Sequence, residues 1–156
     1  LVAGVVLLST GLAGCGTVPG GTAGTPLQVA AQNNQVSTSN HSTVRRAVQI
    51  AQDALYRYDD LRDQWLRSSN DREKDRIEQR MLDTLTNAVS RIRTEASGGY
   101  GWDARQVYDV ADRAISRYES LRRQWQNTSS DRERRELVNS MLTVLTDALK
   151  EIRRMA

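Results

Sequence analysis

Cysteine and histidine, which serve most often as a reactive thiol and as a general base, are scarce in this chain of 156 residues, which has one cysteine, Cys15, and one histidine, His41. A single cysteine excludes an internal disulfide, and a single histidine excludes a site with several histidine ligands. The sequence has no Ser-His-Asp set, no glycine-rich phosphate loop before a helix and no Glu-x-x-His pair of the di-iron type. We therefore expect no enzyme activity and no cofactor. The thiol of Cys15 is the one reactive group whose setting needs an explanation.

Cys15 directly follows an uncharged run with small residues at its end, LVAGVVLLSTGLAG at 1–14. This run is shorter than the ~20 apolar residues that span a bilayer, and it has the length of the apolar part of a secretory signal peptide. Because neither a starting methionine nor a basic segment precedes it, we expect the printed sequence to be truncated at its start. Leu12-Ala13-Gly14-Cys15 resembles the lipobox of bacterial lipoproteins.

The lipobox resemblance implies that the Cys15 thiol carries a diacylglyceryl group, that the signal peptide 1–14 is removed, and that the new amino terminus is acylated. A terminus with several acyl chains binds a membrane firmly, since each buried methylene contributes ~0.8 kcal/mol. By the same resemblance, Gly16 rather than an aspartate after the cysteine favours the outer membrane, facing the periplasm. The other location is the outer face of the plasma membrane. The alternative interpretation is a free thiol behind an ordinary signal peptide.

The segment 15–42 is predicted to be the lipidated cysteine followed by a flexible linker. From Gly16 to Ser42 it is rich in Gly, Thr, Ser, Asn and Gln, holds both prolines of the chain, and has no formally charged residue. Such a composition buries too little apolar surface to offset the entropy lost on ordering. His41 lies in this segment without cysteine, histidine or acidic neighbours, so we assign it no ligand role.

The remaining sequence is a duplication with an offset of sixty residues, so that 45–96 returns as 105–156 without a gap. The clearest match is RYDDLRDQW at 57–65, which returns as RYESLRRQW at 117–125. Apolar residues at helical spacing predict two amphipathic helices in each copy. The copies form two helical hairpins, 43–97 and 103–156, joined by a Gly-rich connection at 98–102.

Capping signals mark where three of these helices start. Asn70 with Glu73, and Ser130 with Glu133, each fit a capping box after a polar break. Asp103 with Gln106 is the corresponding candidate for the first helix of the second copy. From the length over which apolar residues keep a helical spacing, we expect four helices of about 22–26 residues each.

Short loops make neighbouring helices antiparallel, and one hairpin leaves an apolar stripe that its duplicate can cover. The predicted fold is therefore all-α, with the two duplicated antiparallel hairpins forming an up-down four-helix bundle of pseudo-twofold symmetry. An extended pair of hairpins, or hairpins that dimerise with another copy of the chain, are the competing arrangements.

Two arginines interrupt the apolar stripe. At 100° per residue, Arg62 and Arg122 fall among the inward-facing positions, and Glu78 lies on the inward face of the following helix. We expect the arginine methylenes to lie on the core while the guanidiniums reach outward. The alternatives are an anion site or a buried polar cluster in which Glu78 pairs with Arg62, and with Arg122 across the pseudo-twofold, because an unpaired buried charge is costly.

Aromatic residues occur at both ends of the predicted hairpins. Trp65 and Trp125 stand close to the hairpin turns, where we expect them to fill the core. Tyr100 and Trp102, in the Gly-rich connection, are expected to be exposed and are candidates for a contact surface, because aromatic residues are favoured anchors at interfaces.

The charges do not indicate nucleic acid as a partner. Twenty-two basic and 19 acidic residues are interleaved and leave a net charge of only +3. The sequence favours a non-catalytic cell-envelope lipoprotein, held at the membrane by its lipid anchor, whose helical module binds an envelope protein, self-associates or serves a structural role. Two alternatives stay open: binding of anionic envelope polymers or lipids on an Arg-rich face, and carriage of an apolar ligand in the bundle core.

Overall fold

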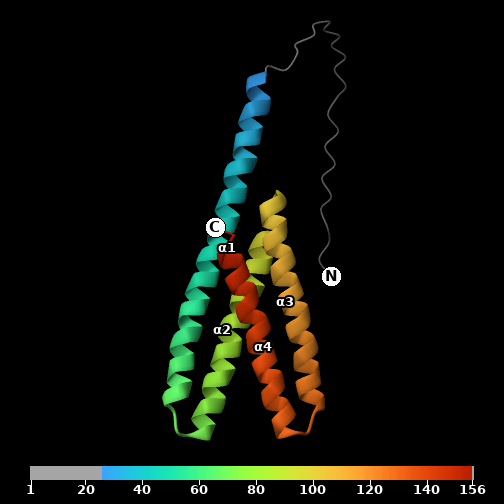
Figure 1. The fold of residues 1–156 in the computed structure, drawn as a ribbon. Coiled ribbons are helices and arrows are strands. Elements are labelled where there is room, and N and C mark those ends of the chain that lie inside the picture. Colours follow the sequence, from blue (N-terminus) through green and yellow to red (C-terminus); the bar gives the residue numbers. More distant parts are fainter. Residues whose placement is uncertain (1–25, 156) are drawn as a thin grey trace, which may run out of the picture.

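A computed structural model describes the backbone of residues 26–155 and the side chains of residues 42–155. Its four helices are α1 (Pro26–Arg67), α2 (Asp71–Ser97), α3 (Trp102–Asn127) and α4 (Asp131–Arg153) (Figure 1). Both α1 and α3 pack against α2 and α4, so helices consecutive in the sequence are also neighbours in space. The predicted up-down four-helix bundle is confirmed. Among the residues that the structure describes, no helix has a stretch with the length and hydropathy of a membrane span.

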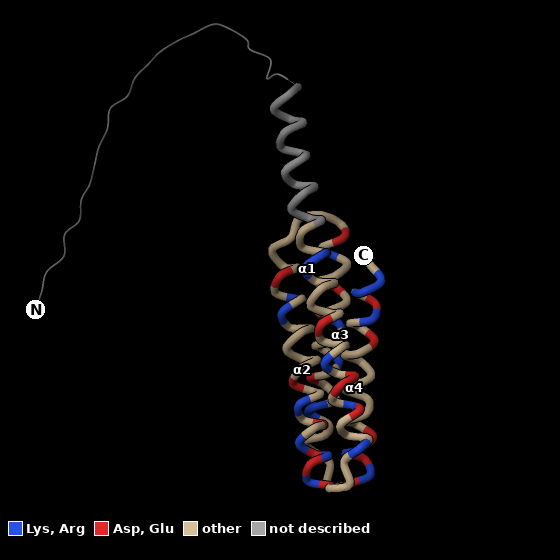
Figure 2. The backbone as a smooth tube through the Cα atoms, turned by 90° about the vertical axis from the view of Figure 1, so that its left-hand side faces the viewer, with Lys and Arg blue, Asp and Glu red and all other residues tan. Residues whose placement is uncertain are grey.

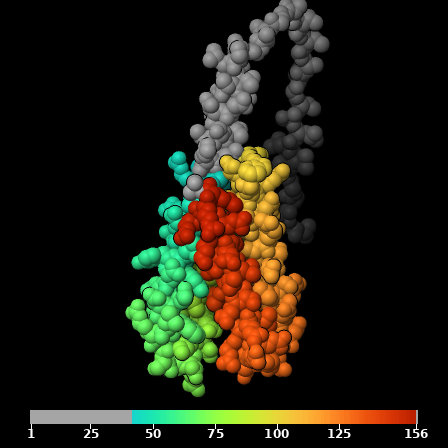
Figure 3. All heavy atoms as spheres, in the orientation of Figure 1, coloured from blue at the N-terminus to red at the C-terminus, as the bar shows by residue number. Residues whose placement is uncertain are grey.

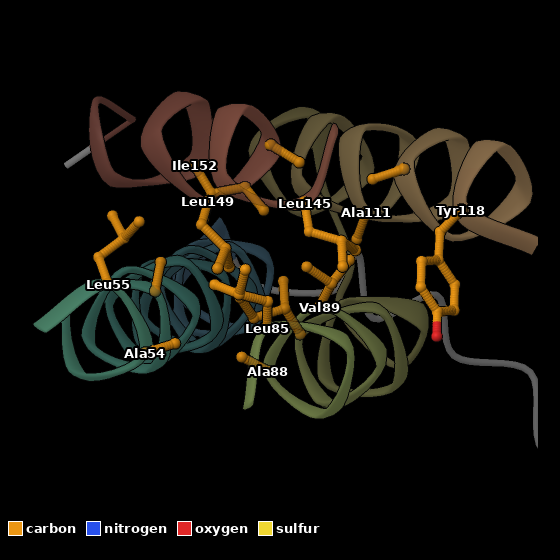
Figure 4. Packing of buried hydrophobic residues seen from close by; sticks show 14 of the residues in the cluster. Ala54, Leu55, Leu85, Ala88, Val89, Ala111, Tyr118, Leu145, Leu149 and Ile152 are labelled. Carbon is orange, nitrogen blue, oxygen red and sulfur yellow. The ribbon is translucent and has the colours of Figure 1, made fainter. Parts of the chain in front are cut away.

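The centre of the core is built from equivalent residues of the two copies. The largest fully buried side chains are Leu85, Val89, Ile92, Val107, Leu145, Leu149 and Ile152. Six of these seven form three pairs separated by sixty residues, and they come from α2 and α4 (Figure 4). α1 and α3 contribute completely buried alanines, such as Ala51 and its counterpart Ala111, beside larger buried side chains such as Leu55 and Val107. The small side chains let the helices approach closely at these positions.

The first helix is longer than the sequence pattern predicted, and this corrects the predicted linker. α1 has 42 residues because it begins at Pro26, so residues 26–42 are helical. No glycine lies between Pro26 and Gly98, and proline is favoured at the first position of a helix because its missing N–H has no partner there anyway. Extending a packed helix also avoids the cost of nucleation. The signal peptide, Cys15 and the rest of the predicted linker lie outside the described residues.

At ~1.5 Å per residue α1 is about 63 Å long, and its first turns project beyond the bundle (Figure 1). The hairpin turns lie at the opposite end, where the tips of the α1–α2 and α3–α4 hairpins stand side by side (Figure 3). The two ends of the molecule are therefore distinct: one holds the start of α1 and the α2–α3 connection, and the other holds both hairpin turns.

In the first hairpin turn, side chains bond to the free backbone N–H groups at the start of α2, and a serine hydroxyl links the two capping residues in a relay. The Asn70 side chain accepts a hydrogen bond from Arg72 N at 3.0 Å. Glu73 does not reach the backbone N–H of Asn70 directly, as a capping box would require. Instead, Ser68 Oγ donates to the Glu73 carboxylate at 3.0 Å and accepts from Asn70 N at 3.3 Å. The predicted start of α2 is correct, with a hydroxyl inserted between its two capping residues.

The same relay occurs in the second hairpin turn. Ser130 Oγ accepts from Glu133 N at 3.4 Å, and the Thr128 hydroxyl bridges the Glu133 carboxylate and Ser130 N. The third predicted capping box, Asp103 with Gln106, is wrong. α3 begins at Trp102 with Gly101 as its cap, and Gly101 has a φ of 115° that a residue with a side chain rarely adopts.

Gly99, in the connection between α2 and α3, is predicted to tolerate no side chain. A Cβ there would lie 2.7 Å from Ala104 Cβ and 3.3 Å from Thr43 Cγ2, so we expect Gly99→Ala to destabilise the fold by about 1–3 kcal/mol through overpacking. Gly98→Ala is the matched control, since nothing lies within 4 Å of its Cβ position. Urea unfolding of both variants checks this, and equal stabilities would show that the connection is not close-packed.

Candidate binding groove between the hairpins

A groove of about 860 Å³ lies between α2 on one side and α3 and α4 on the other, near the hairpin turns. Its apolar lining includes Leu82, Val138 and Met141. Charged side chains line its walls unequally. The α2 wall carries three acidic residues, whereas the α3–α4 wall carries three arginines and one acid: Asp75, Glu78 and Asp83 on α2, with Arg122, Arg134, Arg135 and Asp131 opposite. The groove thus combines an apolar lining with walls of opposite net charge.

Trp65 of the first hairpin is held by Glu78. The indole Nε1 donates a hydrogen bond to Glu78 Oε1 at 3.1 Å, and the Lys74 ammonium lies 4.9 Å from the ring centroid. Trp65 is half-buried and packs against the core, as predicted. The alternative in which Glu78 pairs with Arg62 is wrong: Glu78 bonds to Trp65, and no ion pair between Glu78 and Arg62 occurs among the described residues.

The environment of Glu78 raises the pKa of its carboxyl group above the usual value of 4.5. Burial is the largest cause, because it disfavours the charged form, and the neighbouring Asp75 carboxylate acts in the same direction. The hydrogen bond from Trp65 and the charge of Arg135 oppose these effects but do not cancel them. Glu78 therefore retains its proton to a higher pH in the folded chain than in the unfolded chain.

This shift predicts a pH dependence of stability. When the folded pKa of an acid exceeds the unfolded one, the native state binds more protons in the window between them, so stability falls as pH rises through that window. We expect wild type to lose this contribution above pH 4.5. Glu78→Gln keeps an acceptor for Trp65 without titrating, so its stability relative to wild type should increase across the window. Denaturant unfolding at several pH values measures the difference, and a constant difference would contradict it.

Trp125, the counterpart of Trp65, is arranged differently. The position equivalent to Glu78 is Val138, which offers no acceptor, and no hydrogen bond to the Trp125 indole occurs among the described side chains. The guanidinium of Arg134 lies 5.5 Å from the ring centroid, in the position that the Lys74 ammonium takes over Trp65 at 4.9 Å. Trp125 is 37% exposed and lines the groove. The prediction that it fills the core is therefore wrong, because the hairpins leave its ring open.

The two arginines of the apolar stripe are both exposed, so neither is a buried charge. Arg122 lines the groove, near the aromatic ring of Trp125 one turn further along α3. Arg62 is exposed near the other hairpin tip, outside the groove. The interpretation of a buried polar cluster joining Arg62, Arg122 and Glu78 is therefore wrong.

Tyr100 and Trp102 are exposed, at 75% and 72%, as predicted. They lie at the α2–α3 connection, at the opposite end of the bundle from the groove (Figure 1). The structure therefore does not join them with Arg122 and Glu78 in one site.

The groove was not predicted from the sequence, although one signal of it was present. In the alignment of the two copies, Val138 occupies the position equivalent to Glu78. Trp125 therefore has no counterpart of the acceptor that Glu78 offers to Trp65. In the part of the chain that the structure describes, no cluster of His, Cys, Asp or Glu is arranged to hold a metal ion. The chain matches no known protein family, no curated protein and no solved structure.

Proposed function

We propose that this protein is a non-catalytic cell-envelope lipoprotein, anchored through Cys15, whose helical bundle is an interaction module. The lipobox-like residues supply the anchor, and the outer membrane facing the periplasm is the favoured location. The proposal is supported most directly by the position of the groove relative to the start of α1, the end of the bundle that is nearer to Cys15 in the sequence. Pro26 follows Cys15 by 11 residues, whereas the groove lies at the far end of the bundle, beside the hairpin turns. Anchoring through Cys15 would direct the groove away from the membrane.

The two alternative functions have less support. In the bundle, Lys and Arg alternate with Asp and Glu on the side that Figure 2 shows, an arrangement that does not favour anionic polymers. The groove has charged walls, whereas a site for an apolar ligand is lined mostly by apolar and aromatic side chains. An interaction with a protein partner fits these observations best.

The anchor is tested by comparing wild type with Cys15→Ser in the native host. We expect wild type to partition into the detergent phase with an intact mass raised by its acyl groups, and the variant to remain in the aqueous phase at the mass of the polypeptide. An unmodified Cys15 thiol on wild-type protein in the aqueous phase would overturn the proposal. Chemical crosslinking in the same cells should join wild type to an envelope protein, or to another copy, through the hairpin-turn end.

A further inference from the structure

We propose that the groove between the hairpins binds a short peptide segment of a partner protein, one with an aliphatic side chain flanked by an acidic and a basic residue. The acidic residue would meet Trp125 and Arg122, and the basic residue would meet the carboxylates of α2. This inference deepens the proposed function. It rests on one part of that proposal, namely that the bundle is an interaction module.

The internal duplication gives the first argument, because it supplies a comparison within one molecule. Trp65 and Trp125 occupy equivalent positions, and each has a cation from the following helix over its ring. Only Trp65 also has an acceptor, the Glu78 carboxylate. Trp125 faces a groove and has Val138 in place of that acceptor. A ligand carboxylate in the groove would give Trp125 the bond that Glu78 gives to Trp65.

The cations beside Trp125 give the second argument. Arg122 and Arg135 line the same wall and belong to no ion pair found among the described side chains. A guanidinium binds a carboxylate through two parallel N–H groups when the geometry allows. Arg134 is already engaged, since its Nε donates to Thr128 O at 3.0 Å and its guanidinium lies over the Trp125 ring. Arg122 therefore remains available for an acidic group, and Arg135, whose charge already acts on Glu78, lies on the same wall.

The opposite wall and the apolar lining give the third argument, which selects a peptide with both charges over a polyanion. Asp75, Glu78 and Asp83 on α2 would repel a purely anionic ligand, whereas they complement a lysine or arginine. Leu82, Val138 and Met141 offer apolar contacts for an aliphatic side chain. The volume of about 860 Å³ lies within the range of 300–1,000 Å³ or so that is typical of ligand pockets, which limits the bound segment to a few residues.

A phage-displayed library of random dodecapeptides provides the probe. The bait is the full chain carrying Cys15→Ser, so that binding does not depend on the lipid anchor. We expect enrichment of peptides that place an aliphatic residue between an acidic and a basic one. Polyglutamate serves as the anionic comparison. Failure to enrich any such peptide, or capture of polyglutamate alone with a steep loss of binding on adding salt, would overturn the proposal.

Variants then locate the binding site for the synthetic form of the most enriched peptide. Arg122→Gln and Trp125→Phe should each weaken its affinity at least about tenfold, since each removes a donor to a charged group. Arg62→Gln is the matched control at the equivalent position outside the groove, and it should bind within about twofold of wild type. Equal losses in the Arg62 and Arg122 variants, or no loss in either groove variant, would contradict the assignment.

Val138→Glu tests the argument from duplication by copying Glu78 into the second hairpin. We expect this carboxylate to accept from Trp125, to compete with the acidic residue of the peptide, and to lower the affinity at least as much as Arg122→Gln does. Retention of full affinity by a folded Val138→Glu chain would contradict this role of Trp125. Failure of Cys15 lipidation leaves these binding results unaffected, so the two proposals can fail separately.

Discussion

Replacing Leu85 or its counterpart Leu145 with alanine is expected to lower the free energy of unfolding by about 2–5 kcal/mol, because a cavity replaces a buried side chain. Both leucines are completely buried, and they occupy equivalent positions of α2 and α4 at the centre of the core. The two variants should therefore lose similar amounts, a large share of the ~5–15 kcal/mol typical of a domain. Urea unfolding followed by circular dichroism provides the measurement.

Leu66→Ala is the control for these core variants. Leu66 is 62% exposed at the end of α1, so its replacement should change the stability by no more than about 0.5 kcal/mol. If Leu85→Ala alone lowered the free energy of unfolding, and Leu145→Ala changed it as little as Leu66→Ala, the two copies would not contribute equally to one core.

The second large effect is expected when the chain is ended at Ser97, which leaves only the first hairpin. In the complete chain α2 contacts both helices of the second hairpin, and Leu85, Val89 and Ile92 are completely buried. Without α3 and α4 these side chains face water, at a cost of about 25 cal/mol per Å² of apolar surface. The shortened chain should therefore self-associate or lose most of its helical content.

Sedimentation equilibrium and circular dichroism distinguish the outcomes for the shortened chain. The full chain, at the same concentration, is the control for helical content and cooperative melting. A monomer of the first hairpin that keeps its helices and melts cooperatively would contradict the view that each copy needs the other.

The core of the bundle was predictable because it depends on local patterns. The spacing of Leu85, Val89 and Ile92 matches the helical period, and their repetition sixty residues later indicates that the same face is buried twice. The capping residues Asn70 and Ser130 also marked the starts of α2 and α4 correctly. These features need no knowledge of how the helices meet.

The start of α1 was not predictable from composition. Segment 26–42 lacks charge and apolar periodicity, so a linker was expected, whereas its helix continues directly from the packed part of α1. Composition describes what a segment does alone, and it does not include the effect of attachment to a stable helix.

The groove also depends on how the helices meet. The helical wheel placed Arg62 and Arg122 inward, but it does not show that the hairpins diverge towards their turns (Figure 1), where both side chains reach solvent. It also placed Trp65 and Trp125 in equivalent environments. The replacement of Glu78 by Val138 in the second copy is one difference between them: the Trp65 indole has an acceptor, whereas Trp125 lines the groove.

The packing of one copy of the hairpin against the other within a single chain is the central claim, and methyl NOEs test it most directly. In a sample with labelled methyl groups, we predict NOEs between α2 and α4, from Leu85 and Val89 to Leu145 and Leu149, which share one core. A sample that mixes labelled and unlabelled chains separates contacts within a chain from contacts between chains. NOEs that persist only within a chain would support the bundle, whereas their absence, or their appearance only between chains, would contradict it.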